Sequence, residues 1–303
     1  MCEVPCRILT SKKMLKLSQS EKQFIIDGVE QNLRNDGRAR LDYRDFSLET
    51  GIVSQTNGSA RVKLANHTDV LVGVKVEIGE VDPDFPDQGR LEVHVECSPS
   101  ASYEFEGRGA EDINAQLIST LRNQLKNSFA MDWTKLCIVR GKQCWILYVD
   151  CIVLDSAGNL FDALAIATRA ALYNTKIPKI EVIEISPTET EFEVSDDPHD
   201  YTRIDCSNIP ISVTLGRVGN KFIVDPSLEE EECISTRVSV SVNRKGNICS
   251  IKKSGKQSGI NPSELTKMLQ SSRKIGVTLL EELDKLLEKE EKVTTKQGFF
   301  TDN

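Results

Sequence analysis

Lys252, Lys253 and Lys256 surround Gly255 and form a small basic cluster near the end of the chain. A glycine lets the backbone approach a phosphate closely, and the lysine ammonium groups would offset the phosphate's charge. The cluster could therefore hold a phosphorylated ligand. Ser-Gly-Lys is also common turn composition, so a plain turn after a strand is the alternative.

Arg122 and Lys126 form a second basic pair. They lie four residues apart in a predicted helix, so they share one face of it. That face could line a channel for an anion. The alternative, an ordinary solvated helix face, stays open.

Two groups of carboxylates could also do chemistry. The run Glu229–Glu232 could bind a metal ion, but like charges in a row repel and prefer water, which favours a solvated acidic turn. Asp155 and Asp162 could act as an acid–base pair. Neither has a histidine or lysine partner nearby in the sequence, which favours cap and turn roles.

The cysteines and histidines predict no metal site. None of the nine cysteines forms a C-x-x-C pair, and His67, His94 and His199 lie apart from any cysteine pair. The N-terminus has no apolar segment typical of an export signal, so we expect free thiols in a reducing compartment. There is no Walker loop, no G-x-S-x-G elbow and no Cys–His nucleophile pattern. We therefore expect neither a metal nor a cofactor.

The composition is that of an ordinary globular protein. The 303 residues, 39% hydrophobic and 28% charged, suffice for one large or two medium domains. No apolar run approaches the ~20 residues of a membrane span, so no membrane partner is expected. The net charge is −8. A protein that held nucleic acid by its overall field would be basic, so any such contact must be local or shared with a partner.

The predicted elements follow an irregular order of strands and helices. Helices are predicted over 18–32, 110–127, 159–174 and from 261, where Asn261-Pro262-Ser263-Glu264 is typical of a helix start. Strands are predicted over 46–55, 58–64, 70–78, 91–97, 136–139, 144–154, 209–218, 221–224, 238–242 and 248–252. Asn57-Gly58 indicates a tight hairpin turn, and the run Trp145–Val149 is apolar on both faces, which predicts a central strand. This order predicts a mixed α/β (α+β) architecture.

The chain divides into two predicted lobes. Residues 1–17 are predicted to be an N-terminal extension, 18–186 and 187–292 the two lobes, and 293–303 a disordered tail. The boundary falls in the polar stretch 186–207, which is rich in Asp, Glu, Thr and Pro and predicts a long surface loop.

Three stretches of sequence, in this order, resemble the RNase PH-like subunits of the RNA exosome, and the likeness runs from about Ser18 to Lys289. Their motifs are Asp36-Gly37-Arg38, Asp42-Tyr43-Arg44, Gly58–Leu64 and Val70–Lys75; then Val149-Asp150, Leu154-Asp155, Gly158–Ala163 and Ala170–Thr175; then Val224-Asp225-Pro226, Glu229–Glu232 and Lys253–Lys256. Each motif is weak alone, and their order and spacing make the match specific. Asn66, an extra residue beside the family's Gly-His-Thr turn, is a departure. The resemblance implies an RNase PH-like fold with mixed sheets flanked by helices.

The resemblance also implies which site positions to compare. Active members hold the attacking phosphate with two arginines and use carboxylates after a late strand to hold a metal or donate a proton. The first arginine matches Arg108, but the second falls at Leu160. The catalytic aspartate falls at Arg237, and the other family carboxylate falls near Glu231 within the acidic run. Leucine cannot bind phosphate and arginine reverses the charge, so the resemblance implies an inactive homologue.

The resemblance implies a structural ring subunit that guides RNA without cutting it. Its partners would be other RNase PH-like ring subunits, RNA-binding cap subunits, exosome-associated nucleases and RNA in the ring pore, in the nucleus, nucleolus and cytoplasm. The candidate RNA contacts are Arg108, Arg122, Lys126, Lys252, Lys253 and Lys256, although Arg108 could equally form a local salt bridge. The alternatives are a phosphorolytic 3′→5′ exoribonuclease, a subunit that lends Arg108 to a neighbour's active site, and an unrelated α/β binding protein.

Overall fold

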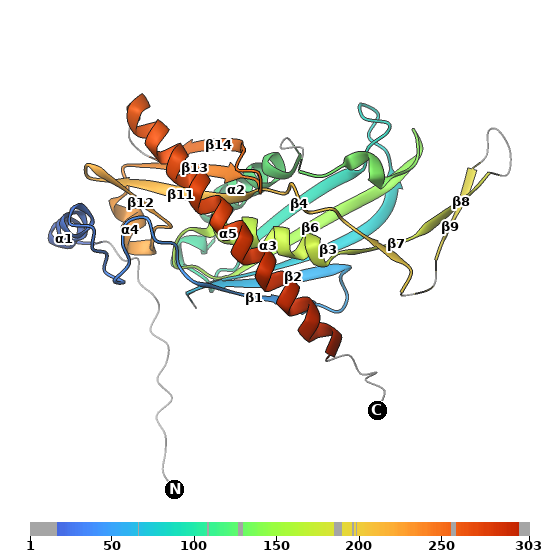
Figure 1. Ribbon diagram of the computed structural model, residues 1–303, viewed down its shortest axis with the longest axis horizontal. Coiled ribbons are helices and arrows are strands. Elements are labelled where there is room, and N and C mark those ends of the chain that lie inside the picture. Colours follow the sequence, from blue (N-terminus) through green and yellow to red (C-terminus); the bar gives the residue numbers. More distant parts are fainter. Residues whose placement is uncertain are drawn as a thin grey trace, which may run out of the picture.

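The computed structural model describes residues 17–65, 67–107, 109–126, 130–184, 190–195, 197, 199–255 and 259–296 (Figure 1). The elements in chain order are α1 (Gln19–Glu30), β1 (Phe46–Thr50), β2 (Gly58–Leu64), β3 (Thr68–Glu80), β4 (Arg90–Cys97), η1 (Tyr103–Phe105), α2 (Gly109–Lys126), η2 (Trp133–Leu136), β5 (Cys137–Val139), β6 (Gln143–Asp155), α3 (Leu160–Asn174), β7 (Lys176–Pro178), β8 (Ile180–Glu184), β9 (Thr190–Val194), β10 (Tyr201–Arg203), β11 (Ile211–Val218), β12 (Lys221–Val224), α4 (Leu228–Cys233), β13 (Thr236–Val242), β14 (Ile248–Ser254) and α5 (Pro262–Lys296). The mixed α/β architecture predicted from the sequence is confirmed.

The first sheet has six strands in the order β1-β2-β3-β6-β4, with β5 paired to the start of β6. All its pairs are antiparallel except β4 with β6, which is parallel. β6 is central, as its apolar sequence predicted. Four consecutive residues, Cys144 to Leu147, are buried there, because elements cover both faces at this end of the strand.

Asn57 and Gly58 do not form the predicted tight turn. β1 ends at Thr50, so residues 51–57 connect it to β2. A Cβ on Gly58 would lie 2.4 Å from the Thr175 hydroxyl oxygen, so the glycine is required by packing against the end of α3. The Asn57 side chain accepts a hydrogen bond from the Val76 N–H (2.9 Å) and donates one to the Lys176 carbonyl. The Asn-Gly pair therefore joins elements that are distant in sequence.

The second sheet is antiparallel throughout, in the order β12-β11-β13-β14. Helix α5 packs on β11 and β13 and continues to β1 of the first sheet, so one long helix spans both sheets, as Figure 1 shows. Its buried side chains include Met268, Leu280 and Leu283. The helix starts at Pro262 as predicted but continues to Lys296, which corrects the expectation of disorder from residue 293. Residues 297–303 lie outside the described part of the chain.

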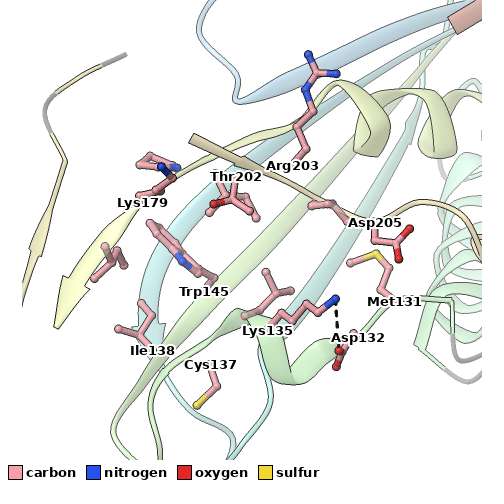
Figure 2. A pocket seen from close by; sticks show the side chains of 15 residues that line it. Met131, Asp132, Lys135, Cys137, Ile138, Trp145, Lys179, Thr202, Arg203 and Asp205 are labelled. Carbon is pink, nitrogen blue, oxygen red and sulfur yellow. Dashed lines mark ion pairs between the residues drawn. The ribbon is translucent and has the colours of Figure 1, made fainter. Parts of the chain in front are cut away.

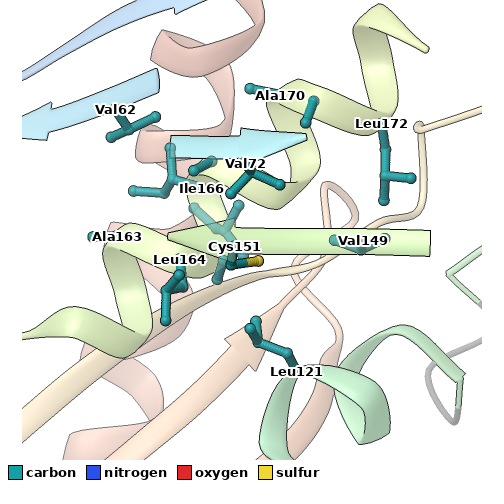
Figure 3. Packing of buried hydrophobic residues seen from close by; sticks show 14 of the residues in the cluster. Val62, Val72, Leu121, Val149, Cys151, Ala163, Leu164, Ile166, Ala170 and Leu172 are labelled. Atoms are coloured by element: carbon teal, nitrogen blue, oxygen red, sulfur yellow. The ribbon is translucent and has the colours of Figure 1, made fainter. Parts of the chain in front are cut away.

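Helix α3 is the centre of the core. Its alanine-rich sequence is buried almost throughout, and Ala163, Ala167 and Ala171 have no exposed surface. Figure 3 shows α3 side chains against Val72 and Cys151 of the first sheet, with Leu121 of α2 nearby. The small side chains let the helix approach the sheet closely.

Two short ribbons correct the prediction of a plain loop over 186–207. β7 pairs with β10, and β8 pairs with β9, so strands occupy 190–194 and 201–203. The predicted lobe boundary at 186–187 and most of the predicted extension, residues 1–16, lie outside the described residues. In the part of the chain that the structure describes, no helix is both long and apolar enough to cross a membrane.

Candidate functional site

A cavity of about 240 Å³ lies where α3 begins, between that helix, α2, α4 and the strands β13 and β14. Leu160, Glu231 and Arg237 all line it. The structure therefore brings together the three family-site positions that the sequence resemblance singled out. Lys252 lines the same cavity.

The start of α3 is held tightly against α4. Gly158 has a φ of +91°, and a Cβ there would lie 2.8 Å from the backbone of Ser227 and Leu228, so only glycine fits. Asn159 follows in the left-handed conformation, with a φ of 56°. Asparagine tolerates that conformation better than most residues. This turn directs the backbone N–H of Asn159, the residue before α3, at Glu231 of α4.

The carboxylate of Glu231 occupies the position in front of that helix start. The Asn159 N–H donates to Glu231 Oε1 at 2.9 Å, and Arg237 Nη2 lies 2.7 Å from the same oxygen. A helix N-terminus carries partial positive charge and favours an anion. Here a side chain of the chain itself supplies the anion, and Arg237 neutralises it. Leu160 beside it offers only an apolar side chain.

The acidic run is a helix, α4, and not the solvated turn predicted from its charges. The Glu230 carboxylate accepts a hydrogen bond from the Ser227 N–H (2.8 Å), which forms a capping box. Glu230 is also buried against Arg34, whose Nε donates to Glu230 Oε1 at 2.7 Å. Arg34, 196 residues earlier in the chain, offsets the charge of Glu230. This reduces the repulsion between neighbouring carboxylates on which the prediction of a solvated turn relied.

Asp225 is the centre of a second buried ion pair. Arg44 contacts both of its carboxylate oxygens, with Nε–Oδ2 and Nη2–Oδ1 distances of 2.7 and 2.8 Å, and Arg38 adds a third contact at 3.1 Å. Burial would raise the pKa of Asp225, but the hydrogen bonds and charge of Arg44 outweigh it and hold the pKa below its usual value. The pair fixes the end of β12 to the segment before β1.

Asp162 is a fully buried anchor, which corrects its predicted cap role. Its carboxylate accepts hydrogen bonds from the Thr214 N–H (2.7 Å) and hydroxyl (2.8 Å), from Asn159 Nδ2 (2.8 Å) and from the Tyr43 hydroxyl (3.3 Å). Burial nevertheless raises the pKa of Asp162 to about 7. Asp155 keeps a local role, because its carboxylate accepts a hydrogen bond from the Ser156 N–H.

The raised pKa of Asp162 predicts a pH dependence of stability. Between about pH 4 and 7 the folded chain holds a proton on Asp162 that the unfolded chain has lost, so this group's contribution to the unfolding free energy falls as pH rises. Asp162→Asn removes that contribution. We expect the wild type to be the more stable at pH 5, and its advantage to shrink by about 2.5 kcal/mol by pH 8, because about two pH units of the shift lie in that range. Urea unfolding at the two pH values measures this; a constant gap would contradict it.

The basic candidates do not form one surface. Lys252 lies in strand β14 as predicted, and Lys253 lies in the same strand and not in the turn after it. Successive residues of a strand point to opposite faces. The Lys252 ammonium is held by the Thr120 hydroxyl, and burial lowers the pKa of Lys252. Lys252 and Lys253 both line a groove against α2 that also contains Asp112, whereas only Lys252 reaches the cavity at the start of α3. Lys256 lies outside the described residues.

The two α2 candidates are engaged away from the cavity. Arg122 forms an ion pair with Glu92 of β4 at 2.8 Å, and the Lys126 ammonium lies 5.4 Å from the centre of the Phe85 ring. Both contacts are local, which agrees with the alternative of an ordinary helix surface. Arg108, the remaining candidate, lies outside the described residues.

Sequence reasoning named Asp225 and Glu230 only as members of motifs and missed the buried ion pairs that they form. The spacing Ser227-x-x-Glu230 is a capping-box signature and could have revealed α4 and its buried carboxylate. The motif around Asp225 gives no sign of its ion pair, because Arg44 and Arg38 are distant in the sequence. Within the described residues, no group of three or more histidine, cysteine or carboxylate side chains could hold a metal ion.

Comparison with known proteins agrees with this arrangement. Residues 42–178 match the model of domain 1 of the 3′ exoribonuclease family, and residues 208–275 match domain 2. A Dictyostelium discoideum protein named putative exosome complex exonuclease RRP42 is 42% identical, over 90% of this chain and 98% of the relative. The exosome complex component Rrp42 of Methanothermobacter thermautotrophicus is 34% identical, over 90% of this chain and 97% of the relative.

Solved structures of archaeal exosomes contain chains that are similar to this one in fold. A chain of an archaeal exosome core superposes with a TM-score of 0.71 at 30% identity, covering 87% of this chain and 96% of that one. A chain of the Archaeoglobus fulgidus exosome with RNA bound to the active site gives 0.74 at 32% identity, covering 86% and 96%.

Two sheets joined through α3, with a cavity where that helix begins, define a protein of RNase PH-like architecture. The chain belongs to the 3′ exoribonuclease (RNase PH) family, and its similar relatives carry the name Rrp42.

Proposed function

We propose that this chain is a non-catalytic subunit of the RNase PH-like ring of the RNA exosome, and that it supports 3′→5′ RNA processing by scaffolding and guiding RNA. The support is its match to both domains of the family, together with relatives named as exosome components across nearly their whole length. Ring closure by such subunits needs complementary interfaces between neighbours.

The Glu231–Arg237 pair at the start of α3 carries the non-catalytic part of the proposal. Phosphorolysis needs an inorganic phosphate bound beside an RNA phosphate, so it needs positive groups free to clamp the attacking anion. In this cavity the helix start and Arg237 are both engaged with Glu231, and Leu160 adds no charge. The two positive groups next to Leu160 are therefore already engaged by the chain's own carboxylate.

Two alternatives to a non-catalytic subunit would give the chain a part in catalysis. A phosphorolytic exoribonuclease is suggested by the name of the Dictyostelium relative, which includes the word exonuclease. A subunit that lends Arg108 to a neighbour's active site is the intermediate case. Phosphate-dependent release of nucleoside diphosphate by the chain alone would favour the first. Release only in an assembly, and lost on Arg108→Ala, would favour the second.

The proposal extends to partners and location. Other RNase PH-like subunits would flank the chain, RNA-binding cap subunits and nucleases would attach to the ring, and RNA would pass through its pore. The acidic net charge of −8 suits a subunit whose neighbours carry more positive charge. We propose residence in the nucleus, including the nucleolus, and in the cytoplasm.

Assembly is the direct test of the ring proposal. Ile152 and Leu154 of the central strand β6 are exposed in the single chain, on the face opposite the core. We expect the chain to form a larger complex when mixed with RNase PH-like exosome subunits at micromolar concentration. Light scattering coupled to size exclusion measures this, with an unrelated protein of similar charge as control. A stable monomer that binds none of those subunits would refute the proposal.

RNA binding by the assembled complex should be strongly salt-dependent. Lysine–phosphate contacts release counterions, so affinity falls with salt in proportion to the number of contacts. Lys253→Glu removes an exposed charge, and we expect it to weaken RNA binding by the complex about threefold or more at low salt. Filter binding across a salt series measures this, with Lys285→Glu on α5 as the matched charge control. Equal affinity of Lys253→Glu and wild-type complexes would remove Lys253 from the candidate contacts.

A further inference from the structure

Cys137 and Cys144 face each other across the β5–β6 hairpin. They are direct partners in its antiparallel register, so their side chains leave the same face of the sheet. The connection between them turns at Gly141, which has a φ of +74° and donates its N–H to the Pro86 carbonyl at 2.8 Å. Both thiols are free.

The register places the two cysteines within disulfide range. Directly opposed Cα atoms in an antiparallel pair are about 4.5 or 5.5 Å apart, depending on the hydrogen-bonding pattern. A disulfide spans about 4.4–6.8 Å between Cα atoms, so either spacing suffices. Cys144 Sγ lies 3.7 Å from the Glu80 carbonyl oxygen, so its side chain must rotate about χ1 towards β5 to form the bond.

No other pair of cysteines in the described residues shares this arrangement. Cys97 and Cys151 lie on neighbouring strands, but their register partners are Val153 and Val95. Cys249, on the edge strand β14, is partly exposed and has no cysteine opposite it. The hairpin pair is therefore distinguished by position.

We propose that Cys137 and Cys144 form a modification site, at which a peroxide oxidises the two thiols to an intramolecular disulfide. The partly exposed Cys137 reacts first: its thiolate attacks a peroxide oxygen, an S–O bond forms, the O–O bond breaks, and hydroxide leaves as water after taking a proton. The Cys144 thiolate then attacks the sulfenic sulfur, so that the S–S bond forms, the S–O bond breaks and a second water leaves. Two thiols lose two electrons, and the peroxide is reduced to two waters.

The bond would fix one wall of a second cavity. This cavity, of about 420 Å³, lies between β5, η2 and the β7–β10 ribbon, and Figure 2 shows Cys137 and Ile138 on β5 with Trp145 beside them. A covalent link from β5 to the central strand would hold that wall in place. The inference rests on the hairpin register and is independent of the proposed function.

The thiol pKa values set the pH range of the reaction. Burial raises the pKa of Cys137, with Asp87 adding to the effect and Arg140 opposing it. Burial also raises the pKa of Cys144, where the Arg90 charge opposes it and the Cys137 thiol adds to it. Oxidation should therefore be slow near neutral pH and faster towards about pH 9, because the thiolate is the reacting form.

Peptide mapping of the full chain tests the proposal. The chain is treated with hydrogen peroxide at micromolar concentration, alkylated with iodoacetamide and cut with trypsin, which cleaves after Arg140 and Lys142 and so separates the two cysteines. We expect a Cys137–Cys144 linked peptide that dithiothreitol removes, formed at least about tenfold faster than any linked peptide of Cys249, because the local effective concentration is millimolar.

Two variants complete the test. Cys137→Ser should abolish the linked peptide, and Cys249→Ser should leave it unchanged. Recovery of Cys137 as a sulfinic acid with Cys144 alkylated would overturn the proposal, as would links formed only between chains on a non-reducing gel. The wild-type map alone distinguishes these outcomes if Cys137→Ser fails to fold.

Discussion

Incubated with a labelled oligoribonucleotide, inorganic phosphate and magnesium, the purified chain should release no nucleoside diphosphate above background. By the sequence resemblance, active family members clamp the attacking phosphate with two arginines, and we expect Leu160 at one of those positions. The same resemblance matches their catalytic aspartate to Arg237, which lies 2.7 Å from Glu231 and lines the cavity with the opposite charge. Each lost electrostatic contact costs about 3 kcal/mol of transition-state stabilisation. Two such losses lower the rate about 10⁴-fold, at about tenfold per 1.36 kcal/mol.

The position of Glu231 leads us to expect that restoring the family residues will not restore activity. Leu160→Arg combined with Arg237→Asp restores the family residues, but it places a second carboxylate beside Glu231 and leaves the helix start blocked. We expect that double variant to remain inactive, and Glu231→Gln alone to remain inactive as well. Thin-layer separation of the labelled products measures the wild type, the double variant and Glu231→Gln against an active RNase PH. Wild-type turnover that disappears on Arg108→Ala would contradict the prediction that the chain is catalytically inactive.

Asp225→Asn should destabilise the chain by about 3–5 kcal/mol, the range for removing one partner of a buried ion pair. Asparagine keeps the shape of the side chain and tolerates the φ of 49° at this position. It removes the charge that faces Arg44 and Arg38, so two buried or half-buried guanidinium groups lose their anion. The midpoint of urea unfolding measures the loss.

Asp69→Asn is the matched control. Arg61 contacts Asp69 through Nε and Nη2, at 2.9 and 2.6 Å, so the geometry resembles that of Arg44 with Asp225. The Arg61 and Asp69 side chains, however, are 32% and 16% exposed. An ion pair open to water contributes about 1 kcal/mol or less. Equal losses for the two variants would show that burial does not set the strength of the Asp225 pair.

Local patterns predicted most of the fold, and contacts distant in sequence account for the errors. Ser18 and Glu21 form the capping box that begins α1, so that helix was visible in the sequence. Helix α4 was not predicted in this way, because the buried carboxylate of its acidic run pairs with Arg34, which is 196 residues distant in the sequence. Gly58 was assigned to a turn, although its missing side chain matters for packing against Thr175.

The candidate site was predictable only in part. The family resemblance placed Leu160, Glu231 and Arg237, and the structure brings them to one cavity. It gave no sign that Glu231 and Arg237 pair with each other, because side-chain pairing depends on where α4 and β13 lie in space. The sequence predicts a helix-cap role for Asp162, because it does not show that Thr214 and Tyr43 donate hydrogen bonds to its carboxylate.

The buried arginine pairs also constrain how the chain is made. Arg44 precedes Asp225 by 181 residues, and Arg34 precedes Glu230 by 196. At about 5–20 residues per second of synthesis, both arginines wait roughly 10–40 seconds for their partners to emerge from the ribosome. During that interval two arginines that are buried in the finished fold have no carboxylate to pair with. The N-terminal part of the chain therefore cannot complete its folded structure until Asp225 and Glu230 have been translated.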